Sequence, residues 1–334
     1  MKVEFPGFFD LQVNGFSGVD FNSPGCPPDR LKHAIDALRA TGVTRFLPTL
    51  ITSSLERFSG CAQVLARCSD PAVAGIHMEG PYISPHNGPR GAHPRGDVRR
   101  ASLEDFRRRQ DAAEGRIVLV TLAPEIPGAL RLTETLVASG IRVAIGHSDA
   151  SAEQIRDAVT AGATLSTHLG NGCKQQLPRH PNLIWEQLAL DELFASFIVD
   201  GHHLSPATVK SMVLAKSPSR SILVTDATAA AASPPGNYTI GVTAIESSAK
   251  GRVSPPGVSG LAGSSLAMND AVANIVRFTG LQLAEVLPMA SVLPARFMGA
   301  EPIGRVSAEW DPQRCCLSVF PGHVEGPRKH ERRE

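Results

Sequence analysis

The feature that most constrains this chain is a series of short apolar runs separated by amphipathic stretches. Eight runs occur, at 8–13, 45–50, 73–78, 117–122, 143–146, 164–167, 194–199 and 221–225. The stretches between them carry apolar residues at helical spacing, and several open with Ser, Thr or Asp, at 29–40, 54–66, 103–113, 129–138, 152–161 and 206–215. Eight buried strands alternating with helices predict an α/β protein with a (β/α)8 barrel, the TIM barrel.

The length of 334 residues accommodates one such barrel with additions. We expect the barrel to occupy residues 1–300, with a β-hairpin inserted at about 237–258 and later helices at 267–278, 283–289 and 292–298. Residues 301–322 include one more strand-like piece, at 315–320. Residues 323–334 are charged and poor in apolar side chains, so we expect a disordered tail there.

The bulk composition excludes several partners. The formal charge of +1 gives no reason to expect binding to nucleic acid or to an acidic membrane. No run of about 18 apolar residues occurs, and no apolar stretch with a cleavage site opens the chain. The six cysteines lack C-x-x-C spacing, so we expect reduced thiols and a cytoplasmic protein.

Ionisable residues follow the apolar runs at the positions where barrel enzymes place their chemistry. Glu79, His147 and His168 follow the third, fifth and sixth runs. One carboxylate and two imidazoles suit Zn²⁺ in a catalytic site, although Fe²⁺ or another first-row divalent ion also fits. Asp226 follows the eighth run and is a candidate general acid and base for hydrolysis, with a helix cap as the alternative.

Other polar residues extend this candidate site. His77 lies two positions before Glu79 on the same face of its strand, either as a further ligand or as a hydrogen-bonding partner of the ligands. The Gly- and Pro-rich segment 89–97 is a loop that can close over a substrate, or an ordinary surface loop. Arg179 is a candidate clamp for an anion, or else a surface charge.

The motifs that carry these residues resemble the amidohydrolase superfamily, and within it the N-acetylglucosamine-6-phosphate deacetylases. The resemblance covers most of the chain, through segments that include His77-Met-Glu-Gly-Pro81, Gly146-His-Ser148, Asp200-Gly-His-His203, Val224-Thr-Asp-Ala227 and Leu261-Ala-Gly-Ser-Ser265. It implies a TIM barrel of the metal-dependent hydrolase type. It also implies that Glu79, His147 and His168 are metal ligands and that Asp226 is the catalytic acid and base.

The resemblance also assigns substrate contacts and a metal count. The implied contacts are Ala92, His93, Asn171, Gly172, Arg179, His203, Leu261, Ala262 and Gly263. Arg179 is expected to reach the sugar phosphate of a neighbouring subunit, which implies a homodimer. Many amidohydrolases bind a second metal through His-x-His on the first strand, whereas this chain has Gln12 and Asn14. Amides are weaker ligands, so we expect one metal ion per subunit and the remains of a second site.

The chain departs from the family in three places. Residues 169–174 read Leu-Gly-Asn-Gly-Cys-Lys, where the family has an aromatic residue and Asn-Ala-Met, and Pro-Arg-His-Pro surrounds Arg179 in place of Gly-Arg-Glu-Pro. Family members also carry about fifty more residues before the first barrel strand, which form part of a small β-sandwich. We therefore expect this sandwich to be reduced or absent, with residues 301–322 as its remnant.

Together these observations predict hydrolysis of the acetamide of N-acetyl-D-glucosamine 6-phosphate to D-glucosamine 6-phosphate and acetate. Two alternatives remain at this point. One is an amidohydrolase that acts on another N-acyl compound, such as an unphosphorylated amino sugar or an N-acyl amino acid. The other is a catalytically silent barrel that binds a sugar phosphate.

Overall fold

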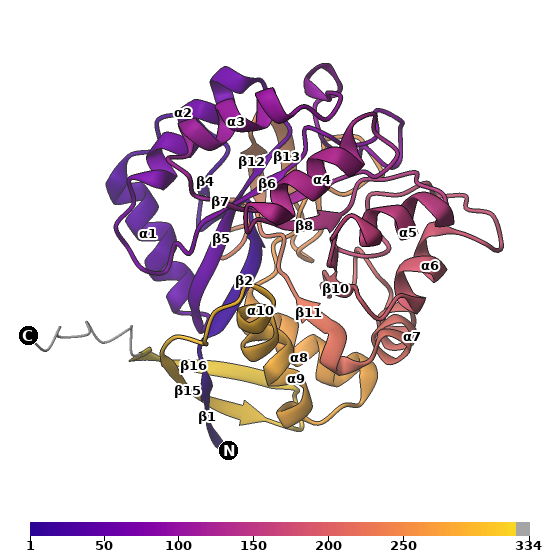
Figure 1. The fold of residues 1–334 in the computed structure, drawn as a ribbon. Coiled ribbons are helices and arrows are strands. Elements are labelled where there is room, and N and C mark those ends of the chain that lie inside the picture. Colours follow the sequence, from indigo (N-terminus) through magenta and orange to yellow (C-terminus); the bar gives the residue numbers. More distant parts are fainter. Residues whose placement is uncertain (325–334) are drawn as a thin grey trace, which may run out of the picture.

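The structure is a computed structural model that describes residues 1–324. Eight parallel strands form one curved sheet that is nearly closed into a barrel, with helices around it (Figure 1). These strands are β2 (Phe8–Val13), β5 (Val43–Ile51), β6 (Ile76–Glu79), β7 (Ile117–Leu122), β8 (Arg142–Ile145), β9 (Leu165–Ser166), β10 (Phe194–Phe197) and β11 (Ser221–Leu223). Each overlaps one of the predicted apolar runs, and the predicted (β/α)8 barrel is confirmed.

The first and last barrel strands meet just beyond their carboxyl ends. Val13 and Ala227 form an isolated parallel bridge there. The amide of Asp226 donates to the carbonyl of Gln12 at 3.0 Å, and the amide of Asn14 donates to the carbonyl of Ala227 at 2.7 Å. These bonds bring the polar residues that follow β2 next to those that follow β11.

Helices connect and cover the strands, mostly where amphipathic spacing predicts them. Their bounds are α1 (Pro28–Arg39), α2 (Leu55–Ala66), α3 (Leu103–Ala112), α4 (Ala129–Ala138), α5 (Ala152–Thr160), α6 (Leu183–Ala189), α7 (Pro206–Lys216), α8 (Met268–Thr279), α9 (Leu283–Ala290) and α10 (Val292–Phe297), with 3-10 turns at Arg95–Asp97 and Pro218–Arg220. Ser54, Ser102, Ser151 and Ser205 each accept a backbone hydrogen bond at a helix start, as good N-caps do. Within residues 1–324, no helix is long and apolar enough to cross a membrane.

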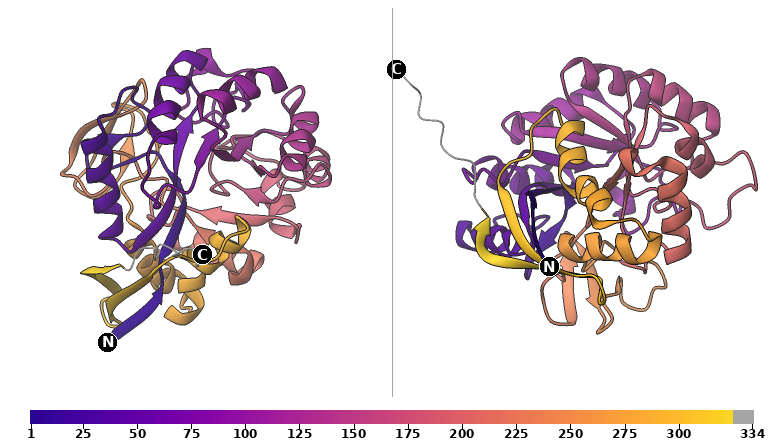
Figure 2. Two further views of the ribbon diagram at one scale, coloured as in Figure 1. Left: turned by 60° about the vertical axis from the view of Figure 1, so that its left-hand side comes forward. Right: turned by 90° about the horizontal axis from the view of Figure 1, so that it is seen from below.

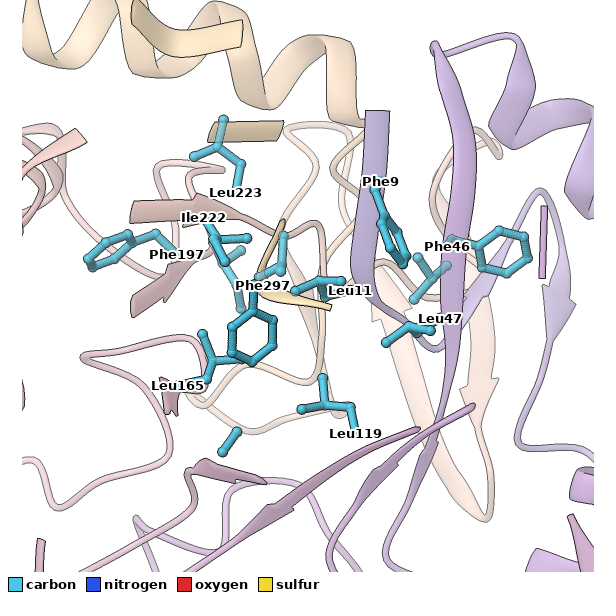
Figure 3. Packing of buried hydrophobic residues seen from close by; sticks show 14 of the residues in the cluster. Phe9, Leu11, Phe46, Leu47, Leu119, Leu165, Phe197, Ile222, Leu223 and Phe297 are labelled. Atoms are coloured by element: carbon cyan, nitrogen blue, oxygen red, sulfur yellow. The ribbon is translucent and has the colours of Figure 1, made fainter. Parts of the chain in front are cut away.

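The barrel interior is filled by side chains from several strands. Figure 3 shows Leu47, Leu119 and Leu165, from β5, β7 and β9, extending toward one central space, whereas Phe46 extends from the other side of β5. All four side chains are buried. The barrel is therefore packed below the site, and chemistry is restricted to its open end.

Two three-stranded antiparallel sheets accompany the barrel. One has the order β1 (Lys2–Pro6), β15 (Arg305–Asp311) and β16 (Cys316–Val324) and lies beside α8–α10 (Figures 1 and 2). Because β1 leads directly into the first residue of β2, this sheet lies at the amino ends of the barrel strands, opposite the polar residues. A small extra sheet domain is thus present beside the barrel. The limits of the domains remain predictions, and residues 325–334 of the expected tail lie outside the described residues.

The second sheet lies in the segment of the predicted hairpin at 237–258. It contains β12 (Gly236–Ile240), β13 (Thr243–Ser247) and β14 (Val253–Ser254) in that order. The first turn falls at Gly241, whose φ of +61° suits glycine. A short pair, β3 (Gly15–Phe16) and β4 (Val19–Asp20), follows β2.

A partly buried ion pair within α3 is linked by a hydrogen bond to the segment that follows β6. Arg109 is fully buried and donates from Nε to Asp105 Oδ2 at 2.8 Å, and the Tyr82 hydroxyl donates to the same oxygen at 2.8 Å. Arg109 also donates to the carbonyl of Ser53 at 3.3 Å and lies 5.1 Å from the centre of the Phe58 ring. The guanidinium thus connects α3 to Ser53 and to α2, and the Asp105 carboxylate connects α3 to Tyr82.

We expect Arg109→Met to lower the free energy of unfolding by about 2–4 kcal/mol, because the substitution leaves the largely buried Asp105 carboxylate without its cation. The matched control is Arg108→Met on the same helix, where the side chain is exposed. We expect this control to change stability by less than about 0.5 kcal/mol. Urea denaturation of both variants measures the difference, and equal midpoints would contradict a stabilising role for the pair.

Candidate metal centre and active site

Three buried ligand candidates converge at the carboxyl ends of the barrel strands. Glu79 is the last residue of β6, and His147 and His168 lie two residues beyond β8 and β9. The φ angles of His147 (+52°), His168 (+31°) and Asp226 (+51°) are positive, a conformation that costs free energy for residues other than glycine. Such strain persists where the surrounding structure enforces it, and it concentrates at functional sites.

The ligand atoms of these residues face one another. His168 Nε2 lies 3.1 Å from Glu79 Oε1 and 3.1 Å from His147 Nε2, and His147 Nε2 lies 3.4 Å from Glu79 Oε1. Neighbouring ligands of a tetrahedral ion with bonds of ~2.1 Å are separated by ~3.4 Å. Three lone-pair donors at these separations repel one another unless a cation or protons lie between them. The group therefore fits a divalent metal ion.

The charge state of Glu79 agrees with this fit. Burial alone raises the pKa of its carboxyl, but hydrogen bonds to His147 and His168 and their charge outweigh burial and hold the pKa well below its usual range. The group is ionised at neutral pH, as a metal-binding carboxylate must be.

The ring of His147 is fixed by the loop that follows β6 and by the loop after β9. His147 Nδ1 lies 3.0 Å from the carbonyl oxygen of Pro89, a contact that leaves Nε2 facing the cluster. A Cβ on Gly91 would lie 3.4 Å from the ring, and one on Gly172 would lie 3.0 Å from Nδ1. Only small residues fit on either side of this imidazole.

Asp226 is held beside the ligand cluster by two amide side chains. Gln12 Nε2 donates to Asp226 Oδ1 at 3.0 Å and to Glu79 Oε1 at 2.8 Å, and Asn14 Nδ2 donates to Asp226 Oδ1 at 2.7 Å. Burial and then the charge of Glu79 raise the pKa of Asp226 to about 6. The carboxyl is thus able to take and return a proton near neutral pH. The assignment of Gln12 and Asn14 to the remains of a second metal site stays a prediction.

His77 lies inside the barrel and outside the ligand group. Its Nε2 is 2.8 Å from Thr121 Oγ1 and its Nδ1 is 3.2 Å from Thr49 Oγ1, so both ring nitrogens have partners. Burial lowers the pKa of His77 to about 4, which keeps the ring neutral. Thr121 in turn hydrogen-bonds to Thr167, next to His168, at 2.8 Å. His77 therefore contacts the ligands only through other residues.

A cavity of about 1050 Å³ opens above the cluster. The centre itself contributes Glu79, His147, His168, Asp226 and Asn14 to its wall. The predicted substrate contacts in the wall are Ala92, His93, Asn171, Gly172, His203, Leu261, Ala262 and Gly263. The structure brings all of these around one space, which is large enough for a sugar phosphate.

Arg179 is the predicted contact that lies elsewhere. Its side chain is exposed, and it does not line the cavity of its own subunit. It lies between Leu177 and α6, in a loop that ends where Asn182 caps that helix. Its expected reach into a neighbouring subunit stays a prediction.

Two histidines in the wall are oriented by specific partners. Asp200 Oδ2 lies 2.8 Å from His203 Nδ1, so the carboxylate accepts a hydrogen bond and His203 Nε2 remains available. Burial would raise the pKa of Asp200, but the hydrogen bonds from His203 and His202 lower it on balance. His93 Nδ1 lies 2.8 Å from Thr52 Oγ1, and its Nε2 is 3.7 Å from Glu79 Oε2.

Sequence reasoning missed the oxygens of Pro89 and Thr52, which orient the rings of His147 and His93. The carbonyl of Pro89 has no side-chain signature, because any residue offers the same oxygen. Thr52 follows β5, and its position at a strand end is the one signal that would have identified it.

These observations define a class: a barrel hydrolase whose chemistry depends on a divalent metal. Residues 4–313 match the amidohydrolase family, and the chain belongs to that family. The predicted resemblance to the deacetylases within it is also confirmed by individual relatives.

The N-acetylgalactosamine-6-phosphate deacetylase of Escherichia coli O157:H7 is 34% identical over 301 residues, which are 89% of this chain and 78% of that protein. The human N-acetylglucosamine-6-phosphate deacetylase is 35% identical over 317 residues, 90% of this chain and 75% of that protein. A solved structure of the Mycobacterium smegmatis N-acetyl-D-glucosamine-6-phosphate deacetylase, in complex with N-acetyl-D-glucosamine-6-phosphate, is also similar. The two chains superpose with a TM-score of 0.88 at 30% identity, over 97% of this chain and 86% of the other.

We expect Gly172→Ala to weaken metal binding about tenfold or more, because the added methyl presses on the His147 ring from a position with positive φ. Gly140→Ala is the matched control, since Gly140 also has a positive φ of +79° but has open space around its Cβ position. Titration of the metal-free variants with Zn²⁺ measures the affinities. Equal affinities in the two variants would contradict the role of Gly172.

Proposed function

We propose that this enzyme hydrolyses the acetamide of N-acetyl-D-glucosamine 6-phosphate to D-glucosamine 6-phosphate and acetate, a step of amino-sugar catabolism. The observation that carries the proposal is the contact of Asp226 with the ligand group through Gln12, which donates to Asp226 and Glu79 together. A proton-transferring carboxyl next to three converging ligands is the equipment for metal-assisted amide hydrolysis.

Glu79, His147 and His168 hold the metal in this proposal. When bound, a divalent ion polarises the amide carbonyl and lowers the pKa of a water molecule. We propose one ion per subunit and Zn²⁺ as its identity, because one carboxylate and two imidazoles are a common catalytic zinc set, while Fe²⁺ shares the same donors.

Asp226 performs both proton transfers. Its Oδ1 accepts from Gln12 and Asn14, which leaves Oδ2 to take the proton of the water that attacks the acetamide carbon. The protonated carboxyl then donates this proton to the sugar nitrogen, the C–N bond breaks, and acetate and a free amine are released. His203, oriented by Asp200, is placed to donate from Nε2 to the carbonyl oxygen or to a substrate hydroxyl.

The oligomer and the phosphate contact belong to the same proposal. Because Arg179 is exposed outside its own cavity, we propose a homodimer in which it reaches the partner's substrate. One relative named above is a deacetylase of the galactosamine phosphate and another of the glucosamine phosphate. These sugars differ at the C4 hydroxyl, so the rates on the two epimers need a direct comparison. The cytoplasmic location stays a prediction.

Acetate release from purified enzyme tests the function directly. The substrate panel contains N-acetylglucosamine and N-acetylgalactosamine, each with and without a 6-phosphate, and one N-acetyl amino acid. The proposal predicts that N-acetylglucosamine 6-phosphate has the highest kcat/KM. A preference for an unphosphorylated sugar or an amino acid would identify another N-acyl substrate, and binding without any turnover would identify a silent barrel.

A further inference from the structure

Positive charge is scarce around the cavity. Among the described residues that line it, Lys174 is the only lysine or arginine, while Glu79 and Asp226 contribute negative charge. A substrate that carries a phosphate dianion needs a cation within reach. Lys174 belongs to the segment 169–174, where the sequence departs from its family.

The backbone around Lys174 is fixed against the metal centre. The amide of Ser148, next to His147, donates to the carbonyl of Gly172 at 3.0 Å. On the other side, a Cβ on Gly88 would lie 3.3 Å from the Cα of Lys174. The lysine therefore starts from a rigid position two residues beyond the contact with His147.

The ammonium group itself is held loosely. Lys174 Nζ lies 2.6 Å from Asp149 Oδ2, and the two side chains are 49% and 24% exposed. Asp149 is positioned by Glu125, which accepts from the Asp149 amide at 2.6 Å and from the Ser148 hydroxyl at 2.7 Å. A partly exposed ion pair of this kind contributes little to stability, so the lysine can exchange its partner at little cost.

We propose that Lys174 binds the phosphate of the substrate from within the same subunit, with Asp149 as its partner when no substrate is bound. This inference rests on the proposed function and names the residue that selects phosphorylated substrates. The phosphate displaces the Asp149 carboxylate from the ammonium, and the lysine serves as a point charge on a flexible stem. Lys174 then supplies a cation from within the same subunit, in addition to the contact proposed for Arg179 of a neighbouring subunit.

The test compares Lys174→Ala with wild-type holoenzyme on N-acetylglucosamine 6-phosphate and on unphosphorylated N-acetylglucosamine. We expect KM for the phosphorylated sugar to rise about tenfold or more, with kcat within twofold and no change on the unphosphorylated sugar. Lys210→Ala, an exposed lysine on α7 outside the cavity wall, is the control for loss of one surface charge. Asp149→Asn frees the ammonium and is expected not to raise KM for the phosphorylated sugar.

Three results would overturn the inference. The first is a KM of Lys174→Ala within twofold of wild type. The second is an equal loss of kcat/KM on both sugars in Lys174→Ala and in Asp149→Asn. The third is a tenfold rise in KM in Arg179→Ala with no rise in Lys174→Ala. Calorimetric binding of N-acetylglucosamine 6-phosphate in an Asp226→Asn background separates this inference from the proposed function. There the Lys174→Ala substitution is expected to weaken binding about tenfold even if the enzyme prefers to hydrolyse a different acyl group.

Discussion

Asp226→Asn is expected to lower kcat for acetate release about a thousandfold while the enzyme retains its metal. The substituted amide keeps an oxygen for the hydrogen bonds from Gln12 and Asn14, but it cannot take a proton from water or return it to nitrogen. General acid and base catalysis by one group contributes roughly 10²- to 10⁴-fold, and here the same carboxyl serves both transfers.

The control for this prediction is Asp157→Asn, an exposed aspartate on α5. It should leave kcat and metal content unchanged. Steady-state kinetics and metal analysis of both proteins are the measurements. A variant with asparagine at 226 that keeps more than about a tenth of wild-type kcat would show that another group transfers the proton.

His168→Ala is expected to weaken metal binding by more than about a hundredfold and to abolish deacetylation. His168 is buried, and its Nε2 lies 3.1 Å from both Glu79 Oε1 and His147 Nε2, so its removal leaves two of the three converging ligands. A site with two ligands holds an ion far less tightly than one with three.

His33→Ala controls for the loss of a histidine, since His33 is exposed and its ring hydrogen-bonds to the Ser17 hydroxyl, far from the ligand group in the sequence. Its metal content and activity should equal those of wild type. Metal analysis after dialysis compares the two. Full metal occupancy in His168→Ala would place the ion elsewhere in the cavity.

The position of the site could be predicted from the sequence because barrel topology decides it. Glu79, His147, His168 and Asp226 each follow an apolar run, and parallel strands in a closed barrel bring those run ends together. The roles of these four residues remain predictions that the mutations above test. What the structure adds is their separation and the way Gln12 joins Asp226 to Glu79.

Several elements could not be predicted because their signals are short or indirect. Helix α6 has seven residues and follows a loop with prolines at 178 and 181, so helical spacing has little room to show. Strand β15 becomes a strand by pairing with β1 at the opposite end of the chain, a contact that local pattern does not encode. The exposed position of Arg179 likewise depends on the path of a loop.

Reconstitution of metal-free enzyme tests the central claim of a hydrolytic centre with one metal most directly. The chelator-treated protein is titrated with Zn²⁺ while acetate release from N-acetylglucosamine 6-phosphate is recorded. The account predicts no activity without metal, then a linear rise that reaches its plateau at one equivalent per subunit. Activity in the metal-free protein, or a plateau only at two equivalents, would contradict it.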